Sequence, residues 1–195
     1  MHPGRPIPPE IIELTHITNR DVEHAPAPRE AVAALAEFVQ GCPVIAHNAT
    51  FDRTFIEAVP GGVNVSDIWI DSLALSRIAL PRLASHKLAS MAELFGCSAV
   101  SHRANDDVDA LAGVWRVLLC ALTDLPAGLL RRFADMHPDV PWSYRPIFSY
   151  LAQERMGRNL AGPLRQDSPQ VKKGMRRAGL GRRILVQTIG VRGAE

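Results

Sequence analysis

The sequence has little cysteine, and its cysteines are not arranged as in a disulfide framework or a metal site. The three that are present, Cys42, Cys97 and Cys120, are widely spaced and form no C-x-x-C pair. An odd number of isolated thiols is typical of a protein that keeps them reduced. We therefore expect structural thiols and a cytoplasmic location.

The sequence also lacks a hydrophobic run long enough to cross a membrane. Its longest apolar region, 111–130, is interrupted by Arg116 and Asp124. Its first residues are rich in proline and polar side chains, unlike the apolar stretch of a signal peptide. We expect neither a membrane span nor a membrane partner.

Excess charge is almost absent overall, but the charges are unevenly distributed. The chain has 22 Lys and Arg against 20 Asp and Glu, a formal net charge of +2. From residue 153 onward we count 10 basic and 3 acidic side chains, and before it 12 and 17. An acidic body with a basic tail fits a body that holds metal ions and a tail that contacts an anionic partner. The alternative is a solvated, partly disordered tail.

With 195 residues, 47% of them apolar, the chain can bury one core and a small appendage. Apolar spacing and helix-end signals predict helices at 28–40, 71–80, 87–95, 104–122, 126–136 and 144–156, and short strands at 44–46 and 65–70. The apolar stripe of the first of these helices is Val32, Leu35, Phe38 and Val39. After residue 157 the periodicity fades, and we expect weak order.

Residues 44–52 combine a short apolar strand, a polar turn and a helix led by Phe51 and Asp52. A carboxylate placed where a strand is followed by a helix lies at the carboxyl end of the strand, where clefts of α/β proteins open. This position favours a catalytic or metal-binding role. The alternative is that Asn48 or Thr50 caps the helix and Asp52 only occupies its positive first turn.

A second polar stretch, 102–107, begins with His102 and ends with Asp107. On an ideal helix these two positions differ by about 140° in direction, so they converge only if His102 precedes the helix and Asp107 lies one turn inside it. Asn105 and Asp106 are residue types that start helices, which favours that geometry. The carboxylate could then hold a divalent metal, and the imidazole could take a proton from metal-bound water. Alternatively, His102 is a cap or surface residue.

Taken together, the two motifs resemble those of the DEDD-type 3′→5′ exonucleases. The pattern HN-x-x-FD, from His47 to Asp52, is followed about fifty residues later by H-x-x-x-x-D, from His102 to Asp107. The match is to the histidine subgroup, which includes the proofreading epsilon subunit of bacterial DNA polymerase III and ribonuclease T. The loop at 3–8 and the helices at 70–81 and 88–96 are similar too, so the resemblance covers residues 1–122.

The resemblance implies an α/β fold of the ribonuclease-H-like class that hydrolyses phosphodiester bonds at the 3′ ends of nucleic acid, with DNA expected. It implies two Mg²⁺ or Mn²⁺ ions, with Asp52 and Asp107 as metal ligands and His102 as the general base. A DNA polymerase subunit is a further expected partner. Three more residues would position the terminal nucleotide: Asn48, Phe51 and His47.

The family's first motif is D-x-E on its first strand, and we expect no D-x-E motif anywhere in this chain. The chain begins at the loop before the first helix, so we expect a helix-rich fold that lacks its first three strands and carries a basic C-terminal tail. Glu10, Glu13 or Asp21 could in principle substitute, but none lies on a recognisable strand. Two interpretations stay open. Either an N-terminal part is missing through truncation or a late start codon, or a short product retains half a site and acts as a binding or scaffolding module. In both cases we expect impaired catalysis.

These considerations divide the chain into an N-terminally incomplete exonuclease-like domain at 1–122, a helical extension at 123–156 and a basic, weakly ordered tail at 157–195. Missing strands should leave an apolar edge exposed around Val44–Ala46. The alternative is that residues 65–70 and a tail segment within 184–189 fill the vacated positions and rebuild a small sheet.

Overall fold

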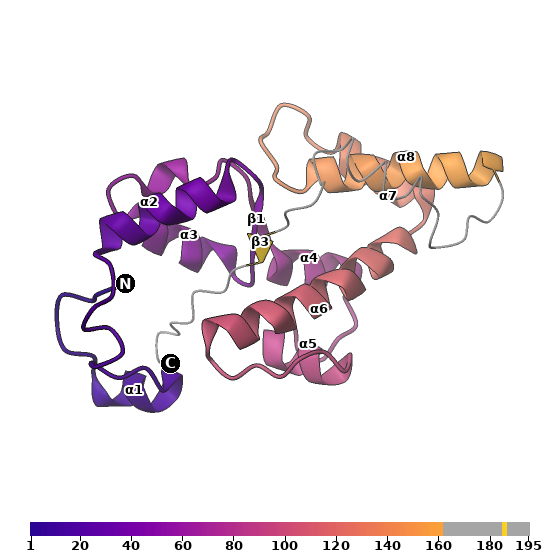
Figure 1. Cartoon of the computed structure of the whole chain (residues 1–195). Helices are drawn as coiled ribbons and strands as arrows, with labels where there is room; N and C mark the ends of the chain where they lie inside the picture. Colours follow the sequence, from indigo (N-terminus) through magenta and orange to yellow (C-terminus); the bar gives the residue numbers. More distant parts are fainter. Residues whose placement is uncertain (162–184, 187–195) are drawn as a thin grey trace.

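The computed structural model describes residues 1–161 and 185–186 (Figure 1). Its elements are, in chain order, α1 (Pro9–Thr15), α2 (Pro28–Val39), β1 (Val44–Ala46), α3 (Ala49–Glu57), the 3₁₀ helix η1 (Gly62–Asn64), β2 (Trp69–Asp71), α4 (Ser72–Ala79), α5 (Leu88–Leu94), α6 (Ala104–Thr123), α7 (Ala127–Asp135), α8 (Arg145–Ala161) and β3 (Leu185–Val186).

The described strands form a parallel sheet in the order β2-β1-β3. Val44 is paired with Trp69 on one side and with Leu185 on the other. The alternative to an exposed edge, in which a tail segment fills a vacated position, is thus confirmed for Leu185 and Val186. The other residues of 184–189 lie outside the described residues. Because β1 has a neighbour on both sides, the sheet has been rebuilt around it.

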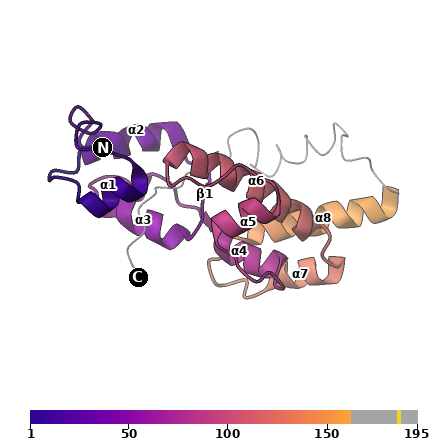
Figure 2. The ribbon, with the colours of Figure 1, turned by 90° about the horizontal axis from the view of Figure 1, so that it is seen from below.

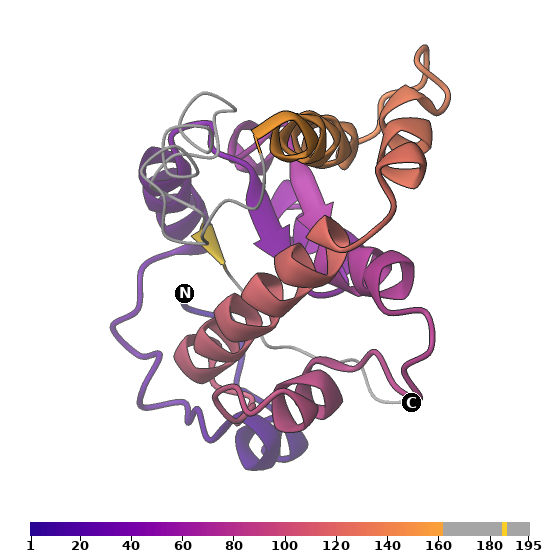
Figure 3. The same cartoon turned by 90° about the vertical axis from the view of Figure 1, so that its right-hand side faces the viewer.

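Side chains of β1 alternate between two hydrophobic clusters, one on each face of the sheet. Val44 and Ala46 pack with apolar residues of α2 and α3, such as Val32 and Ile56. Ile45 packs on the other face, with the apolar residues of α4, α5, α6, α7 and α8. Figure 2 shows these two groups of helices on opposite sides of β1, and Figure 3 shows α6 lying across β1 and β2. Two helical layers around a parallel sheet define the α/β class.

The predicted exposed edge at β1 is wrong. Val44, Ile45 and Ala46 are 2%, 1% and 0% exposed, because helices cover both faces and a strand lies on each side. Phe38, which belongs to the predicted apolar stripe of α2, is 59% exposed. The buried residues of α2 are Val32 and Val39, and they form the face of the helix that packs on the core.

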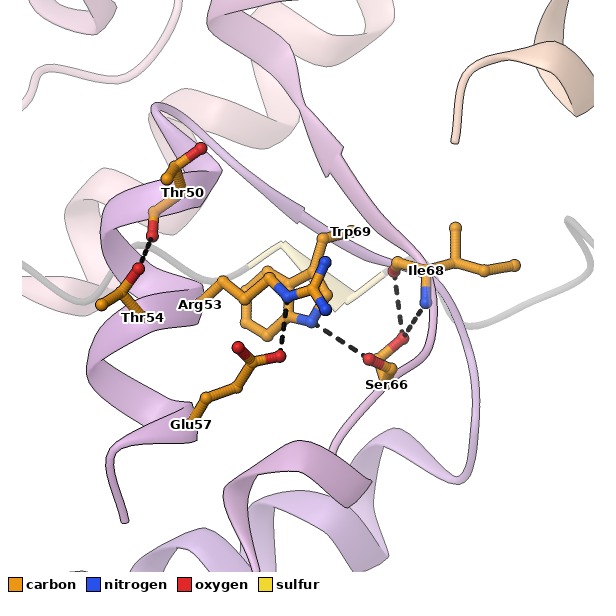
Figure 4. A network of polar contacts seen from close by, with 7 residues as sticks. All are labelled: Thr50, Arg53, Thr54, Glu57, Ser66, Ile68 and Trp69. Carbon is orange, nitrogen blue, oxygen red and sulfur yellow. Dashed lines mark hydrogen bonds and ion pairs between the residues drawn. The ribbon is translucent and has the colours of Figure 1, made fainter. Parts of the chain in front are cut away.

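The predicted strand at 65–70 begins only at Trp69. Ser66 prevents an earlier start: its hydroxyl lies 2.9 Å from the Cys42 carbonyl and accepts a hydrogen bond from the Ile68 amide at 3.1 Å. A side chain that bonds nearby backbone groups competes with the ladder of a sheet. The Trp69 indole donates to the Ser66 carbonyl at 3.1 Å, which fixes the same turn (Figure 4).

The helical extension packs into the same core as α4 to α6. Leu130 of α7 and Phe148 of α8 are fully buried in that cluster, and the Phe148 ring stacks on Trp142 with centroids 5.4 Å apart. Helix α8 runs to Ala161, beyond its predicted end at 156. Across the described part of the chain, no helix is long and apolar enough to cross a membrane.

Candidate active site

Polar side chains gather at the edge of the sheet where β1 and β2 end. Carboxyl ends of neighbouring parallel strands meet at one edge, where α/β proteins place their sites. Asp71 ends β2, and its Oδ1 accepts a hydrogen bond from the Leu73 amide at 2.9 Å, so it caps α4 as predicted. The same oxygen accepts a hydrogen bond from the Asn48 amide at 2.9 Å. Asp71 therefore fixes the turn that follows β1.

His47 connects this turn to two other segments. Its Nε2 lies 2.9 Å from the His86 carbonyl, and because a carbonyl only accepts, Nε2 carries the proton of that bond. Its Nδ1 lies 3.0 Å from the Ser72 hydroxyl, which in turn lies 3.1 Å from the Ala46 carbonyl. The imidazole is thus held between the end of β1, the start of α4 and the loop before α5.

Asn48 occupies the N-cap position of α3 without using its side chain as a cap. Its backbone is left-handed, with φ of 71°, a conformation that asparagine tolerates better than most residues. The hydrogen bond to Asp71 holds it there. Its exposed side chain lies at the same end of α3 as Phe51, which is 37% exposed. These two predicted nucleotide contacts therefore both reach solvent.

Asp52 lies in the first turn of α3 and is only 3% exposed. A carboxylate that merely favoured the positive end of a helix would remain in water, whereas this one faces the interior. The side chains of the first motif therefore differ in exposure. Asn48 and Phe51 face outward, and Asp52 and His47 face inward.

The second motif has the arrangement that its spacing required. His102 lies in the turn before α6, half-buried and with a left-handed φ of 61°, and Asp107 lies in the first turn of that helix. Asp107 is 3% exposed and accepts a hydrogen bond from the Ser101 amide at 3.2 Å. The Ser101 hydroxyl bonds Asp106, so both acidic side chains hold the loop that carries His102.

The expectation that the sequence has no D-x-E motif is wrong, because Asp21-Val22-Glu23 is such a triplet. It lies in a turn after α1 and on no strand. Asp21 accepts hydrogen bonds from the Thr18 amide at 2.8 Å and hydroxyl at 2.7 Å, and these bonds, with the nearby Arg103 charge, hold the pKa of Asp21 below its usual value. Its backbone setting differs from that of a first-strand motif.

Asp21 nevertheless lies close to the second motif. It lines a hollow of about 410 Å³ together with residues that flank the start of α6. The other residues of that hollow are His16, Ile17, Arg103, Ala104, Asn105 and Asp106. A contact between distant segments of this kind carries no signal in the sequence.

Metal-binding geometry is not complete in the described part of the chain. No group of three or more His, Cys, Asp or Glu side chains within it is arranged to hold a metal ion. Asp52 and Asp107 are suitable oxygen ligands by type, but a hard divalent cation takes about six oxygen ligands. The described residues therefore do not by themselves fit a two-metal centre.

A parallel sheet with helices on both faces is an α/β fold, and a match to a protein family identifies it as the ribonuclease-H-like class that the resemblance implied. Residues 1–115 match the exonuclease family RNase_T, and the chain belongs to this family.

Three relatives illustrate how the chain is related to known proteins. The PolC-type DNA polymerase III of Caldanaerobacter subterraneus subsp. tengcongensis is 34% identical over 128 residues, which are 64% of this chain and 9% of that protein. The DNA polymerase III subunit epsilon of Treponema pallidum is 32% identical over 111 residues, 54% of this chain and 52% of that one. The 3′-5′ exonuclease DinG of Staphylococcus aureus is 26% identical over 159 residues, 80% of this chain and 18% of that one.

The matched regions thus span about half, or less, of the length of these curated relatives. No solved structure matches the chain.

Proposed function

We propose that this protein acts at the 3′ ends of nucleic acid, with DNA as the expected substrate. The observation that carries the proposal is the placement of the two motifs. Each puts a buried aspartate, Asp52 or Asp107, in the first turn of a helix, within the order and spacing of a 3′→5′ exonuclease. Membership of the exonuclease family supports the same reading.

In this proposal the outward-facing residues bind the end of the strand. Asn48 and Phe51 contact the terminal nucleotide, and His47 supports them by fixing the turn between β1 and α3. His102 is the general base, since it stands half-buried on a loop that Asp106 and Asp107 hold in place.

The expected cofactor is Mg²⁺ or Mn²⁺, with Asp52 and Asp107 as ligands. Two carboxylates balance too little charge for two divalent cations, so we expect the chain alone to hydrolyse slowly or not at all. The alternative function is a non-catalytic module that binds nucleic acid or a DNA polymerase subunit. The incomplete ligand set of the described residues favours this alternative over full activity.

The test uses the full chain and a single-stranded DNA oligonucleotide labelled at its 5′ end, with Mn²⁺ or with EDTA. We expect either slow stepwise shortening from the 3′ end, lost in EDTA and in Asp52→Asn and Asp107→Asn, or binding without shortening. Typical enzymes turn over about 1–10³ times per second, and we expect a rate far below that range. Cutting at internal positions, or no binding at all, would contradict the proposal.

A further inference from the structure

A second exposed phenylalanine follows Phe51 on helix α3. Phe51 and Phe55 are 37% and 46% exposed and stand four residues apart. Residues at this spacing share one face of a helix and are about 6 Å apart along its axis. The two side chains thus form a short aromatic row on the surface.

Both rings line one hollow of about 460 Å³. We call it the α3 hollow; its lining residues are Asn48, Thr50, Phe51, Thr54, Phe55 and Ala58. It begins at the turn that carries Asn48 and continues along the outer face of α3 toward its last turn. The α3 hollow is therefore continuous with the proposed contact for the terminal nucleotide.

None of the residues that line the α3 hollow is charged. The Thr54 hydroxyl donates a hydrogen bond to the Thr50 carbonyl at 2.8 Å, so it is turned back onto the helix (Figure 4). Arg53, a neighbour on α3, uses its Nε to bond Glu57 at 2.7 Å. The hollow thus offers aromatic faces rather than a cation, which suits a base and not a phosphate.

The size of the α3 hollow also limits what can occupy it. The helix that carries the hollow has nine residues and is about 13 Å long. One face of such a short helix is too small for a stable protein interface, which buries about 800 Å² on each partner. Rows of aromatic side chains bind successive bases of single strands by stacking. Each stacked base raises the affinity about 5- to 100-fold. A base of a single strand is thus the occupant that fits.

We propose that the α3 hollow binds the penultimate base of a single-stranded 3′ end, by stacking on Phe55. The inference rests on the proposed function, which places the terminal nucleotide at Asn48 and Phe51. It adds Phe55 as a binding residue.

The test measures binding of a fluorescent single-stranded oligonucleotide to the full chain in EDTA, where no hydrolysis occurs. We expect Phe55→Ala to weaken binding about 5- to 100-fold and Phe55→Trp to retain it. The matched control is Phe38→Ala on α2, which removes an even more exposed ring outside the hollow and should leave affinity unchanged. Equal unfolding midpoints for these variants exclude a folding defect as the cause.

A second arm identifies the nucleotide that Phe55 contacts. An oligonucleotide without a base at its penultimate position should bind the wild type as weakly as the intact oligonucleotide binds Phe55→Ala. The affinity of Phe55→Ala for this oligonucleotide should equal its affinity for the intact one, because the substitution has already removed the contact that the missing base would make. Fully additive losses would overturn the proposal.

The outcomes separate this inference from the proposed function. If Phe51→Ala weakens binding and Phe55→Ala does not, the penultimate site is wrong and the proposed function stands. If Asn48→Ala, Phe51→Ala and Phe55→Ala all bind like the wild type, both are wrong.

Discussion

Tyr144 and Asp71 connect the helical extension to the sheet edge that carries the candidate site. The Asp71 amide donates to the Tyr144 hydroxyl, and that hydroxyl donates to the Asp71 carbonyl, each at 3.2 Å. Burial, together with the nearby Asp71 carboxylate, raises the pKa of Tyr144 to about 12. A side chain from residue 144 thus supports the turn at Asn48 through a single intermediate residue.

This pKa predicts how stability depends on pH. In the unfolded chain Tyr144 ionises near 10.0, and in the folded protein near 12, so between these values only the unfolded state has lost the proton. The unfolding free energy contributed by Tyr144 is therefore complete below pH 10 and falls as pH rises toward 12. Urea unfolding below pH 10 and near pH 12 measures the loss. Tyr144→Phe should show a smaller loss than the wild type, and an equal loss would contradict the assignment.

Asp71→Ala should destabilise the protein by about 1–3 kcal/mol, because the Leu73 and Asn48 amides both lose their acceptor. Asp67→Ala is the matched control, since Asp67 is exposed and lies in the loop before β2. Urea unfolding of both variants checks the difference. A shift that is the same in both would mean that Asp71 does not stabilise the turn.

Single residues were predictable where local spacing encodes their role. The positions of Asp52 and Asp107 in the first turns of their helices, and of His102 just before α6, were predictable because helix geometry depends on local sequence. Bonds from Asp71 to Asn48 and from His47 to His86 could not be found in that way. They join residues that are distant in the chain, and only the fold brings them together.

At the scale of elements, helix periodicity and capping residues predicted most boundaries to within one or two residues. β1 has its predicted bounds, and α6 begins at the predicted Ala104. The late start of β2 was not predictable from propensity, because Ser66 bonds the Cys42 carbonyl, which is distant in the sequence, in the segment before β1. The exposure of Phe38 was not predictable, because periodicity identifies an apolar stripe but does not show how much of its width is covered.

Gly62 is required by the packing of α3 against η1. A Cβ at this position would lie 1.9 Å from the Ile56 carbonyl oxygen and 2.6 Å from its carbon, both backbone atoms that cannot turn away. Gly62→Ala should therefore destabilise the protein by about 1–3 kcal/mol.

The matched control is Gly128→Ala in α7, where nothing lies within 4 Å of the added Cβ. It should be neutral or stabilising by up to about 1 kcal/mol, because alanine favours helix. Thermal unfolding of both variants measures the contrast. Equal unfolding midpoints for the two variants would show that α3 and η1 can move apart to accept the added methyl group without loss of stability.

Across the whole molecule, an acidic body is followed by a basic tail, and the described tail residues Leu185 and Val186 lie in the sheet. β3 pairs with β1 in parallel, so the tail contributes to the fold as well as carrying charge. The sequence predicted the charge asymmetry and the possibility of this pairing. It could not fix the register, because two apolar residues fit many edges.

The basic residues of the tail should add affinity for nucleic acid without sequence preference. The change is replacement by glutamine of Lys172, Lys173, Arg176, Arg177, Arg182 and Arg183, which leaves β3 unaltered. Each lost phosphate contact should reduce the slope of log affinity against log salt by about 0.7 on single strands. Fluorescence anisotropy at several salt concentrations measures the slope. An unchanged slope would favour docking to a polymerase subunit as the role of the tail.

The central claim, recognition of a 3′ end, is tested most directly by comparing DNA with and without one. The measurement is the affinity of the full chain, in EDTA, for a linear single strand and for a closed circle of the same length and sequence. A third strand, with a bulky group on its 3′ end, separates 3′ from 5′ recognition. We predict tighter binding of the free linear strand than of the other two, with the difference lost in Phe51→Ala. Equal affinity for all three would contradict the account and leave a protein that binds nucleic acid without regard to its ends.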